Sequence, residues 1–260
     1  MKIEVLFPEI CNLFGDMGNI RYLKKSVPDL EIIETNLNQK PYFVSAFEKG
    51  LEMPSMIYMG TLTENGQLLV IKRLKPYCEI IKKCIDNNIN FLITGNAFEV
   101  FGKAVFEDEK KVSDGIGIFD FVAKRSSRFR YNTFYVGNFN PGNNKEPIKI
   151  VGFKCLFGHS YGTVFENGAF NTIVGYGANP ETRNEGIRIH NFFATYLIGP
   201  FLILNPLFTA WYLKELMRVD KKPAFFDDAI DAYNDRLKEF MEPNRDFHYY
   251  KTTKKKYLKG

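Results

Sequence analysis

Short apolar runs alternate with helical stretches through the first half of this chain, and this alternation constrains the fold more than any other feature. The strand-like runs are residues 2–7, 29–35, 55–60 and 88–95. Helical stretches lie between them at 19–28 and at 65–87, where Pro76 is predicted to break the helix. Strands separated by helices favour a parallel sheet that is covered on both faces. The sequence therefore predicts an α/β fold.

The second half changes character, because strand-like runs follow one another with glycine and asparagine at the turns. These runs are 117–124, 132–139, 148–156 and 171–178, and two amphipathic helices are predicted after them at 206–218 and 224–241. We expect a three-layer α/β domain over residues 1–241, with a mostly parallel sheet and an antiparallel extension. A basic tail is expected at 242–260.

The positive charge of the chain is concentrated at its C-terminal end. The formal net charge is +5, and residues 251–260 contain five lysines and no acidic residue, so the rest is neutral overall. A neutral body argues against nucleic-acid binding. No apolar run reaches the roughly 18–20 residues that a membrane helix needs. The N-terminus lacks a signal-peptide pattern, so a cytoplasmic protein is expected.

The cysteines and histidines give no sign of a metal centre. The four cysteines form no C-x-x-C pair, and none has a metal-ligand spacing with any of the three histidines. We expect neither a metal nor a cofactor.

The segment 6–20, LFPEICNLFGDMGNI, combines several turn-forming residues where the first predicted strand gives way to a helix. Ligands of open α/β sheets bind at the carboxyl ends of strands. Asp16 is therefore either a ligand-binding residue or a helix cap, and Asn12 and Asn19 belong to the same loop.

The same segment resembles the opening L-Y-P-D-x-x-N-x-Y-G-D-x-G-N of the amidotransferase subunit of lipid II isoglutaminyl synthase. That subunit belongs to the CobB/CobQ-like branch of the class I glutamine amidotransferases. The resemblance continues in order through YMGTL (58–62), VGFK (151–154), GYGANPETRNEG (175–186) and TYLIGPFLILNP (195–206). It implies a class I glutamine-amidotransferase-like, flavodoxin-like domain, and it places Gly60 and Thr61 at the family's glycine-rich oxyanion turn.

Glutamine hydrolysis needs a thiolate nucleophile, an imidazole base and donors for the oxyanion. The family's thiol lies in C-G-G-Y-Q-L-L-G, and the resemblance puts that cysteine at Gly95 of the run GNAFEVFG (95–102). The family's histidine in T-Y-L-H-G-P falls on Ile198. Glycine readily adopts the strained backbone of a nucleophile elbow. The resemblance thus implies an elbow that is kept as architecture without its catalytic side chains.

Two ways to restore a nucleophile remain open on the sequence. A shift of the alignment by one residue places Thr94 at the elbow. Alternatively, Cys155 and His159 form a relocated nucleophile and base. On one strand these two residues would lie about 13 Å apart, so this pair requires a turn at Phe157 and Gly158.

The candidate pocket contains loop residues near the expected elbow. They are Asn12, Asp16, Asn19, Gly60, Thr61, Asn96, Phe98 and Glu99. Bulky or apolar residues stand where the family is small or polar, and they predict a closed pocket that does not bind glutamine. They are Phe98, Phe101, Phe157 and Ile198.

The resemblance also implies a partner, a Mur-ligase-like or other amide synthetase subunit. The leading hypothesis is a catalytically degenerate protein that acts as a partner subunit or as a ligand-binding pseudoenzyme. One alternative is an active subunit with a relocated nucleophile that supplies ammonia for amidation of lipid II or of a cobyric-acid-like substrate. The other is a free-standing small-molecule sensor.

Overall fold

A six-stranded sheet forms the centre of the computed structural model, which describes residues 1–142 and 145–243. Across the sheet the strands are β13 (Ile187–Ile189), β14 (Phe192–Thr195), β4 (Phe91–Thr94), β3 (Met56–Met59), β1 (Lys2–Leu6) and β2 (Glu31–Thr35). All neighbouring pairs are parallel except the edge strand β13, which runs antiparallel to β14. The predicted mostly parallel sheet with an antiparallel extension is confirmed.

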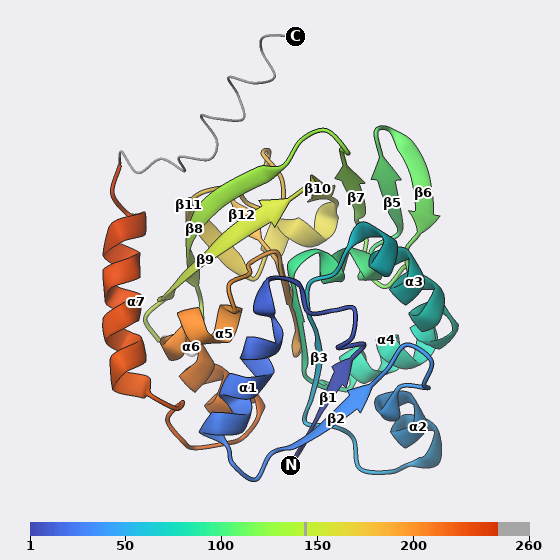
Figure 1. Cartoon of the computed structure of the whole chain (residues 1–260), viewed down its shortest axis with the longest axis horizontal. Coiled ribbons are helices and arrows are strands. Elements are labelled where there is room, and N and C mark those ends of the chain that lie inside the picture. Colours follow the sequence, from blue (N-terminus) through green and yellow to red (C-terminus); the bar gives the residue numbers. More distant parts are fainter. Residues whose placement is uncertain (143–144, 244–260) are drawn as a thin grey trace.

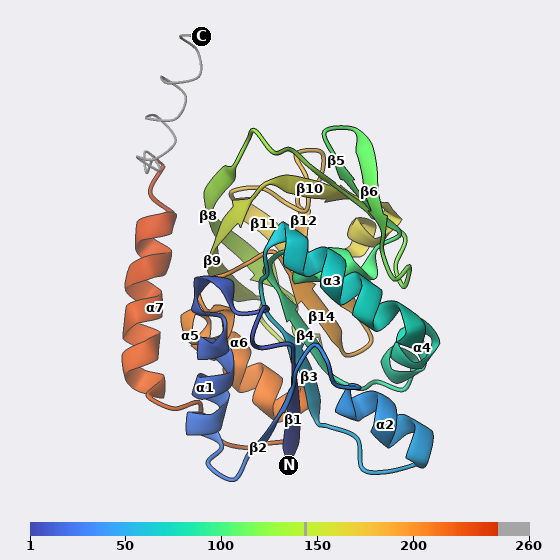
Figure 2. The ribbon, with the colours of Figure 1, turned by 45° about the vertical axis from the view of Figure 1, so that its right-hand side comes forward.

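Both faces of this sheet are covered, as Figures 1 and 2 show. Strand β3 illustrates why, because all four of its side chains are buried. Ile57 and Met59 pack into the core beneath α2 to α4, whereas Met56 and Tyr58 pack into the core beneath α1, α5 and α6. Since side chains alternate along a strand, a strand covered on both faces is apolar throughout. The chain therefore has the three layers that its sequence predicts.

The helices that supply these layers are short and separated by tight connections. They are α1 (Met17–Ser26), α2 (Tyr42–Lys49), α3 (Glu64–Leu74), α4 (Cys78–Asp86), α5 (Phe201–Leu204) and α6 (Pro206–Trp211). The long helical stretch predicted at 65–87 is divided by a 3₁₀ turn, Lys75–Tyr77, that contains Pro76. Proline lacks the N–H that a continuing helix requires, so the predicted break is confirmed. No helix in the described part of the chain has the length and apolarity needed to cross a membrane.

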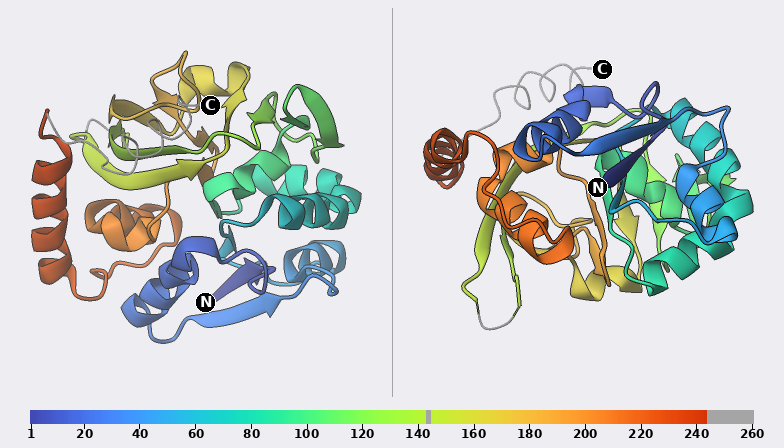
Figure 3. Two further views of the ribbon diagram at one scale, coloured as in Figure 1. Left: turned by 45° about the horizontal axis from the view of Figure 1, so that its top comes forward. Right: turned by 90° about the horizontal axis from the view of Figure 1, so that it is seen from below.

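Two smaller four-stranded sheets carry most of the second half. One has the order β10 (Gly158–Tyr161), β7 (Val122–Arg125), β5 (Ala104–Glu107) and β6 (Lys110–Asp114). The other has the order β12 (Asn184–Glu185), β11 (Phe170–Val174), β8 (Tyr131–Phe139) and β9 (Ile148–Leu156). Helix α7 (Phe226–Phe240) lies along the outside of the molecule (Figure 3). Its Tyr233 and Phe240 side chains pack against β8 and β9.

Two predicted strands are wrong in their extent. The strand predicted at 117–124 is regular only from residue 122, because Gly117 has a φ of +78° and the backbone of 117–119 bonds to residues 101 and 102. The strand predicted at 171–178 ends at Val174, where Gly175 turns the chain with a φ of +89°. The helix predicted at 206–218 becomes a π-turn after residue 211. The basic tail lies, from residue 244 onward, outside the described residues.

Candidate functional site

The candidate site lies where β1, β3 and β4 end and their following loops meet. Loop 7–16 follows β1, residues 60–63 follow β3, and a 3₁₀ helix, η3 (Gly95–Phe101), follows β4. A cavity of about 170 Å³ opens beside these loops. Among the residues that line it are Thr61, Asn96, Glu99, Arg125, Arg130 and Cys155. The structure thus brings three of the predicted pocket residues, Thr61, Asn96 and Glu99, around one cavity.

Gly95 has the backbone conformation of an elbow but no room for a side chain. Its φ is +63°, in the left-handed region that favours glycine. A Cβ at this position would overlap Thr61 Oγ1 and would lie 2.7 Å from Thr61 Cγ2. The Thr61 side chain therefore occupies the space into which a residue at position 95 would project.

Asp16 holds Thr61 in this position. Its Oδ2 accepts hydrogen bonds from Thr61 N–H (2.7 Å), Thr61 Oγ1 (2.5 Å) and Thr94 Oγ1 (2.9 Å). Burial raises the pKa of the Asp16 carboxyl, and the bonds from Thr61 oppose that rise. The Thr61 N–H at the predicted oxyanion turn is thereby committed to a carboxylate of the protein itself. Thr94, the other candidate for the elbow, is fully buried in the same network.

The other loop residues of the predicted pocket lie outside the cavity lining. Asn12 is exposed and its Oδ1 accepts from Met17 N–H, so the capping side chain of α1 is Asn12 and not Asp16. Asn19 is buried and bridges Tyr58 Oη and the backbone of α5. Gly60 is needed for close approach, because a Cβ there would lie 2.6 Å from Cys11 O. These residues fix the loops rather than face a ligand.

Helix η3 is bound to the turn after β3 at its beginning. Asn96 Oδ1 accepts from Leu62 N–H at 3.1 Å, and Asn96 Nδ2 donates to Leu62 O at 2.9 Å. Phe98 and Phe101 point into the core and are buried, with Phe98 against Tyr196 and Phe101 against Phe192. Phe98 and Phe101, two of the residues predicted to close the pocket, therefore fill the core beneath the turn. The cavity beside the turn stays open.

Glu99 links η3 to the rest of the site through a buried hydrogen-bond chain. Its Oε1 accepts from Tyr196 Oη at 2.7 Å, and its Oε2 accepts from Gln67 Nε2 at 2.8 Å. Gln67 Oε1 accepts in turn from Arg125, whose Nε is paired with Glu107 at 2.8 Å. Burial raises the pKa of Glu99. Glu99 is thus a buried network residue at the edge of the cavity.

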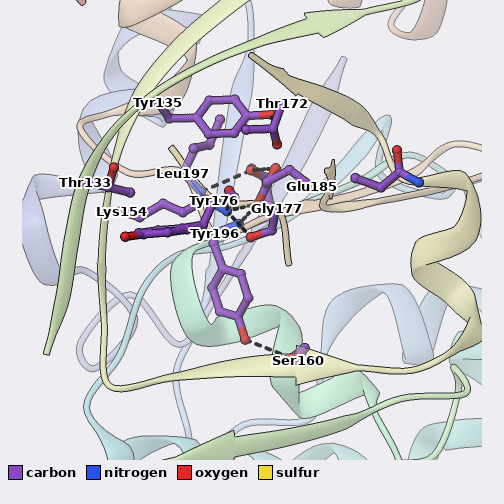
Figure 4. Close-up of polar contacts among 12 residues, drawn as sticks. Thr133, Tyr135, Lys154, Ser160, Thr172, Tyr176, Gly177, Glu185, Tyr196 and Leu197 are labelled. Carbon is purple, nitrogen blue, oxygen red and sulfur yellow. Dashed lines mark hydrogen bonds and ion pairs between the residues drawn. The ribbon is translucent and has the colours of Figure 1, made fainter. Parts of the chain in front are cut away.

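A buried ion pair anchors the segment that contains the predicted histidine position. Lys154 Nζ lies 3.5 Å from Glu185 Oε1 and donates to the carbonyls of Tyr176 and Gly177 at 2.8 Å each (Figure 4). Glu185 also accepts from Tyr196 N–H and from Thr195 Oγ1. Burial lowers the pKa of Lys154 to about 8, although Glu185 raises it. The pair fixes strand β14 and the turn after it.

Ile198 lies in the turn after β14, and its side chain is buried. Its exposed fraction is 6%, and its backbone pairs with Phe153 of β9 in both directions. The predicted histidine position therefore carries an apolar side chain.

Cys155 and His159 do not share a strand. Cys155 belongs to β9 and His159 to β10, which lie in different sheets, with Phe157 between the two strands. No hydrogen bond joins the two side chains in the described part of the chain. Instead, the His159 ring packs 4.4 Å from Tyr131, and burial with the charge of Lys154 lowers the pKa of His159 to about 4. Burial raises the pKa of the Cys155 thiol, and Arg130 opposes that rise.

Sequence reasoning missed the polar residues that hold this site together from a distance. They are Gln67, Arg125, Glu185 and Tyr196. Gln67 lies within a helix and Arg125 ends a strand, so local pattern gives no sign of either. Glu185 and Tyr196 lie within the motifs at 175–186 and 195–206, but those motifs gave no role to either residue. The feature that all four share is a buried polar side chain, which only the folded chain reveals.

The chain is similar to the GatD subunit of lipid II isoglutaminyl synthase (glutamine-hydrolyzing) from two bacteria. It is 26% identical to the Staphylococcus aureus subunit over 211 residues, which covers 78% of this chain and 79% of that subunit. It is 22% identical to the Streptococcus pneumoniae subunit over 247 residues, covering 92% and 88%. No family model matches the chain.

The solved structures that match the chain include two glutamine amidotransferases. One, from Thermotoga maritima, has a TM-score of 0.46 at 11% identity and covers 90% of this chain and 92% of that chain. The other has a TM-score of 0.45 at 12% identity and covers 83% and 99%.

Proposed function

We propose that this chain is a CobB/CobQ-like glutamine amidotransferase-type protein that has lost glutaminase chemistry and acts as a partner subunit. The observation that carries the proposal is the Thr61 side chain in the space beside Gly95. A thiol needs both a side chain at the elbow and room in front of it. Gly95 supplies no side chain, and the overlap with Thr61 leaves no room for one.

The proton-transfer and oxyanion parts of the site support the same conclusion. Position 198 carries a buried isoleucine that cannot take or return a proton. At the oxyanion turn, Thr61 N–H is bonded to Asp16 and Leu62 N–H to Asn96. A developing oxyanion needs donors that are aimed at it and not already occupied. The nucleophile and the base are thus missing, and both backbone N–H donors are already bonded to side chains of the protein.

Similarity to GatD subunits gives the proposal its biological setting. Those relatives are named as subunits of a glutamine-hydrolyzing lipid II isoglutaminyl synthase. We therefore propose a Mur-ligase-like or other amide synthetase as the partner of this chain. The buried networks around Glu99 and Glu185 would keep the fold, and with it the partner surface, after the catalytic groups were lost.

The test is glutamate release from glutamine by the chain alone and with a co-purifying synthetase. We expect none from the natural chain, from Cys155→Ala, or from Gly95→Cys alone, because Thr61 still fills the space. The combination Gly95→Cys, Thr61→Gly and Ile198→His restores thiol, space and base together. Its matched control lacks only Ile198→His and should remain far less active. Release by the natural chain that Cys155→Ala abolishes would overturn the proposal.

The cavity favours a second candidate function, a ligand-binding pseudoenzyme or free-standing sensor. It is lined by cationic, acidic and amide side chains, among them Arg125, Arg130, Glu64 and Asn96. Titration calorimetry with glutamine and with glutamate tests it directly. Saturable binding without hydrolysis would support this second function, and it would contradict the prediction that the pocket does not bind glutamine.

A further inference from the structure

The turn Leu13–Gly15 stands at the mouth of the 170 Å³ cavity and exposes two large apolar side chains. Leu13 and Phe14 both line the cavity, yet Leu13 is 37% exposed and Phe14 is 49% exposed. Beneath them the cavity wall is partly apolar, formed by Leu62, Leu156 and Phe157. An apolar surface thus lies next to two apolar side chains that are only half covered.

The backbone of this turn is strained in a way that keeps Phe14 outside. Phe14 has a φ of +58° and Gly15 a φ of +73°. Glycine takes this conformation freely, but a phenylalanine pays for it in close contacts between Cβ and the backbone. Because the Phe14 side chain is half exposed, its packing does not compensate for the strain in its backbone. A movement of the turn would relieve that strain.

The turn is held at its ends and free at its tip. Leu13 N–H bonds to Thr61 O at 3.0 Å, and Asn12 Oδ1 accepts from Met17 N–H at 2.9 Å. Within the described residues, the Phe14 side chain makes no ring contact. Two fixed ends around a free, strained tip form a hinged segment.

We infer that Leu13–Gly15 is a lid that closes by placing the Phe14 ring in the cavity, against Leu156 and Phe157. The lid controls access to the site of the proposed function, but it does not depend on whether glutaminase activity has been lost. Closing buries the Phe14 ring and releases its left-handed backbone. The ligand-free chain therefore exchanges between the open turn described above and the closed form, whereas a ligand in the cavity keeps the lid open. The same motion covers or uncovers Cys155, which lines the cavity floor.

Cys155 offers a way to fill the cavity without knowing a ligand. In a Cys78→Ser, Trp211→Phe, Phe14→Trp chain, position 14 carries the single tryptophan and Cys155 is the one partly exposed thiol in the described part of the chain. Alkylation of Cys155 with iodoacetamide should block closure. We expect the emission of the introduced tryptophan to move to longer wavelength and its quenching by acrylamide to increase.

The matched control keeps Cys78 and carries Cys155→Ser, so that alkylation falls on a thiol outside the cavity lining and leaves the tryptophan emission unchanged. If the tryptophan variant does not fold, the rate at which iodoacetamide alkylates Cys155 gives the same information. Phe14→Ala should raise that rate relative to the rate at Cys78, because no ring is left to cover Cys155. Complete alkylation with no change in the tryptophan signal, or an unchanged Cys155 rate in Phe14→Ala, would overturn the lid, and Phe14 would then be a fixed wall or a partner contact.

Discussion

Gly95→Ala is the substitution for which the structure predicts the most specific outcome. The new Cβ would meet a φ of +63° and would overlap Thr61 Oγ1, with Thr61 Cγ2 only 2.7 Å away. The left-handed backbone costs an L-residue roughly 1–2 kcal/mol. Overpacking in a closed site costs about 1–3 kcal/mol more. We therefore expect the free energy of unfolding to fall by about 2–5 kcal/mol, a large part of the roughly 5–15 kcal/mol of a typical domain.

A control separates these two costs. Gly117 has a φ of +78°, but a Cβ there would have nothing within 4 Å. Gly117→Ala should therefore lose only the backbone part, about 1–2 kcal/mol. The difference between the two alanine variants measures the space that Thr61 occupies.

A double-mutant cycle with Thr61→Gly then tests the cause. Thr61→Gly alone removes the hydrogen bond from Thr61 Oγ1 to the Asp16 carboxylate, worth about 1.5–3 kcal/mol for a charged acceptor. In the double variant the overlap is gone, so its loss should be smaller than the sum of the single losses by about 1–3 kcal/mol. Urea unfolding followed by circular dichroism measures each value, with the m-value checked for constancy.

Two results would refute this reasoning. One is a Gly95→Ala loss no larger than that of Gly117→Ala. The other is a cycle that is additive within about 0.3–0.5 kcal/mol, the agreement expected for independent sites. Either would mean that Thr61 does not occupy the space in front of the elbow.

The other predictions concern the buried charges and the thiols. Lys154→Met should destabilise the fold by about 3–5 kcal/mol in urea unfolding, because it leaves Glu185 buried without its ion partner. Adding Glu185→Gln should recover part of the loss, because glutamine carries no charge and its carbonyl oxygen still accepts a hydrogen bond from Tyr196 N–H or Thr195 Oγ1. The pKa of His159 is lowered to about 4 in the folded chain, so between about pH 6.5 and pH 4 the unfolded chain binds the extra proton. Stability should therefore fall as pH falls through that window, by up to about 2–3 kcal/mol from this residue, and His159→Gln should remove that part of the pH dependence of thermal unfolding. Iodoacetamide should modify Cys78 and Cys155 in the folded chain and reach the two buried thiols only on unfolding, as peptide mass spectrometry would show.

Much of the fold could be predicted from the sequence because its signals are local. The alternation of apolar runs with helical stretches predicted the parallel sheet, and Pro76 predicted the break between α3 and α4. The hairpin of β5 and β6 was missed because Asp108 and Glu109 make its turn with positive φ, although neither is the glycine or asparagine that usually marks such a turn. Helix α2 was missed as well. Local signals fail where tertiary packing imposes a conformation on residues that do not prefer it.

The sequence by itself determined that position 95 carries no thiol and position 198 no imidazole, since both follow from residue identity within ordered motifs. Only the tertiary structure decided that the space at the elbow is occupied. The contacts responsible join Asp16 to Thr61 and Thr61 to Gly95. The two members of each pair lie far apart along the chain and meet only once the strands have paired. Periodicity and motif spacing describe neighbours along the chain, so they carry no information about which buried polar group finds which partner.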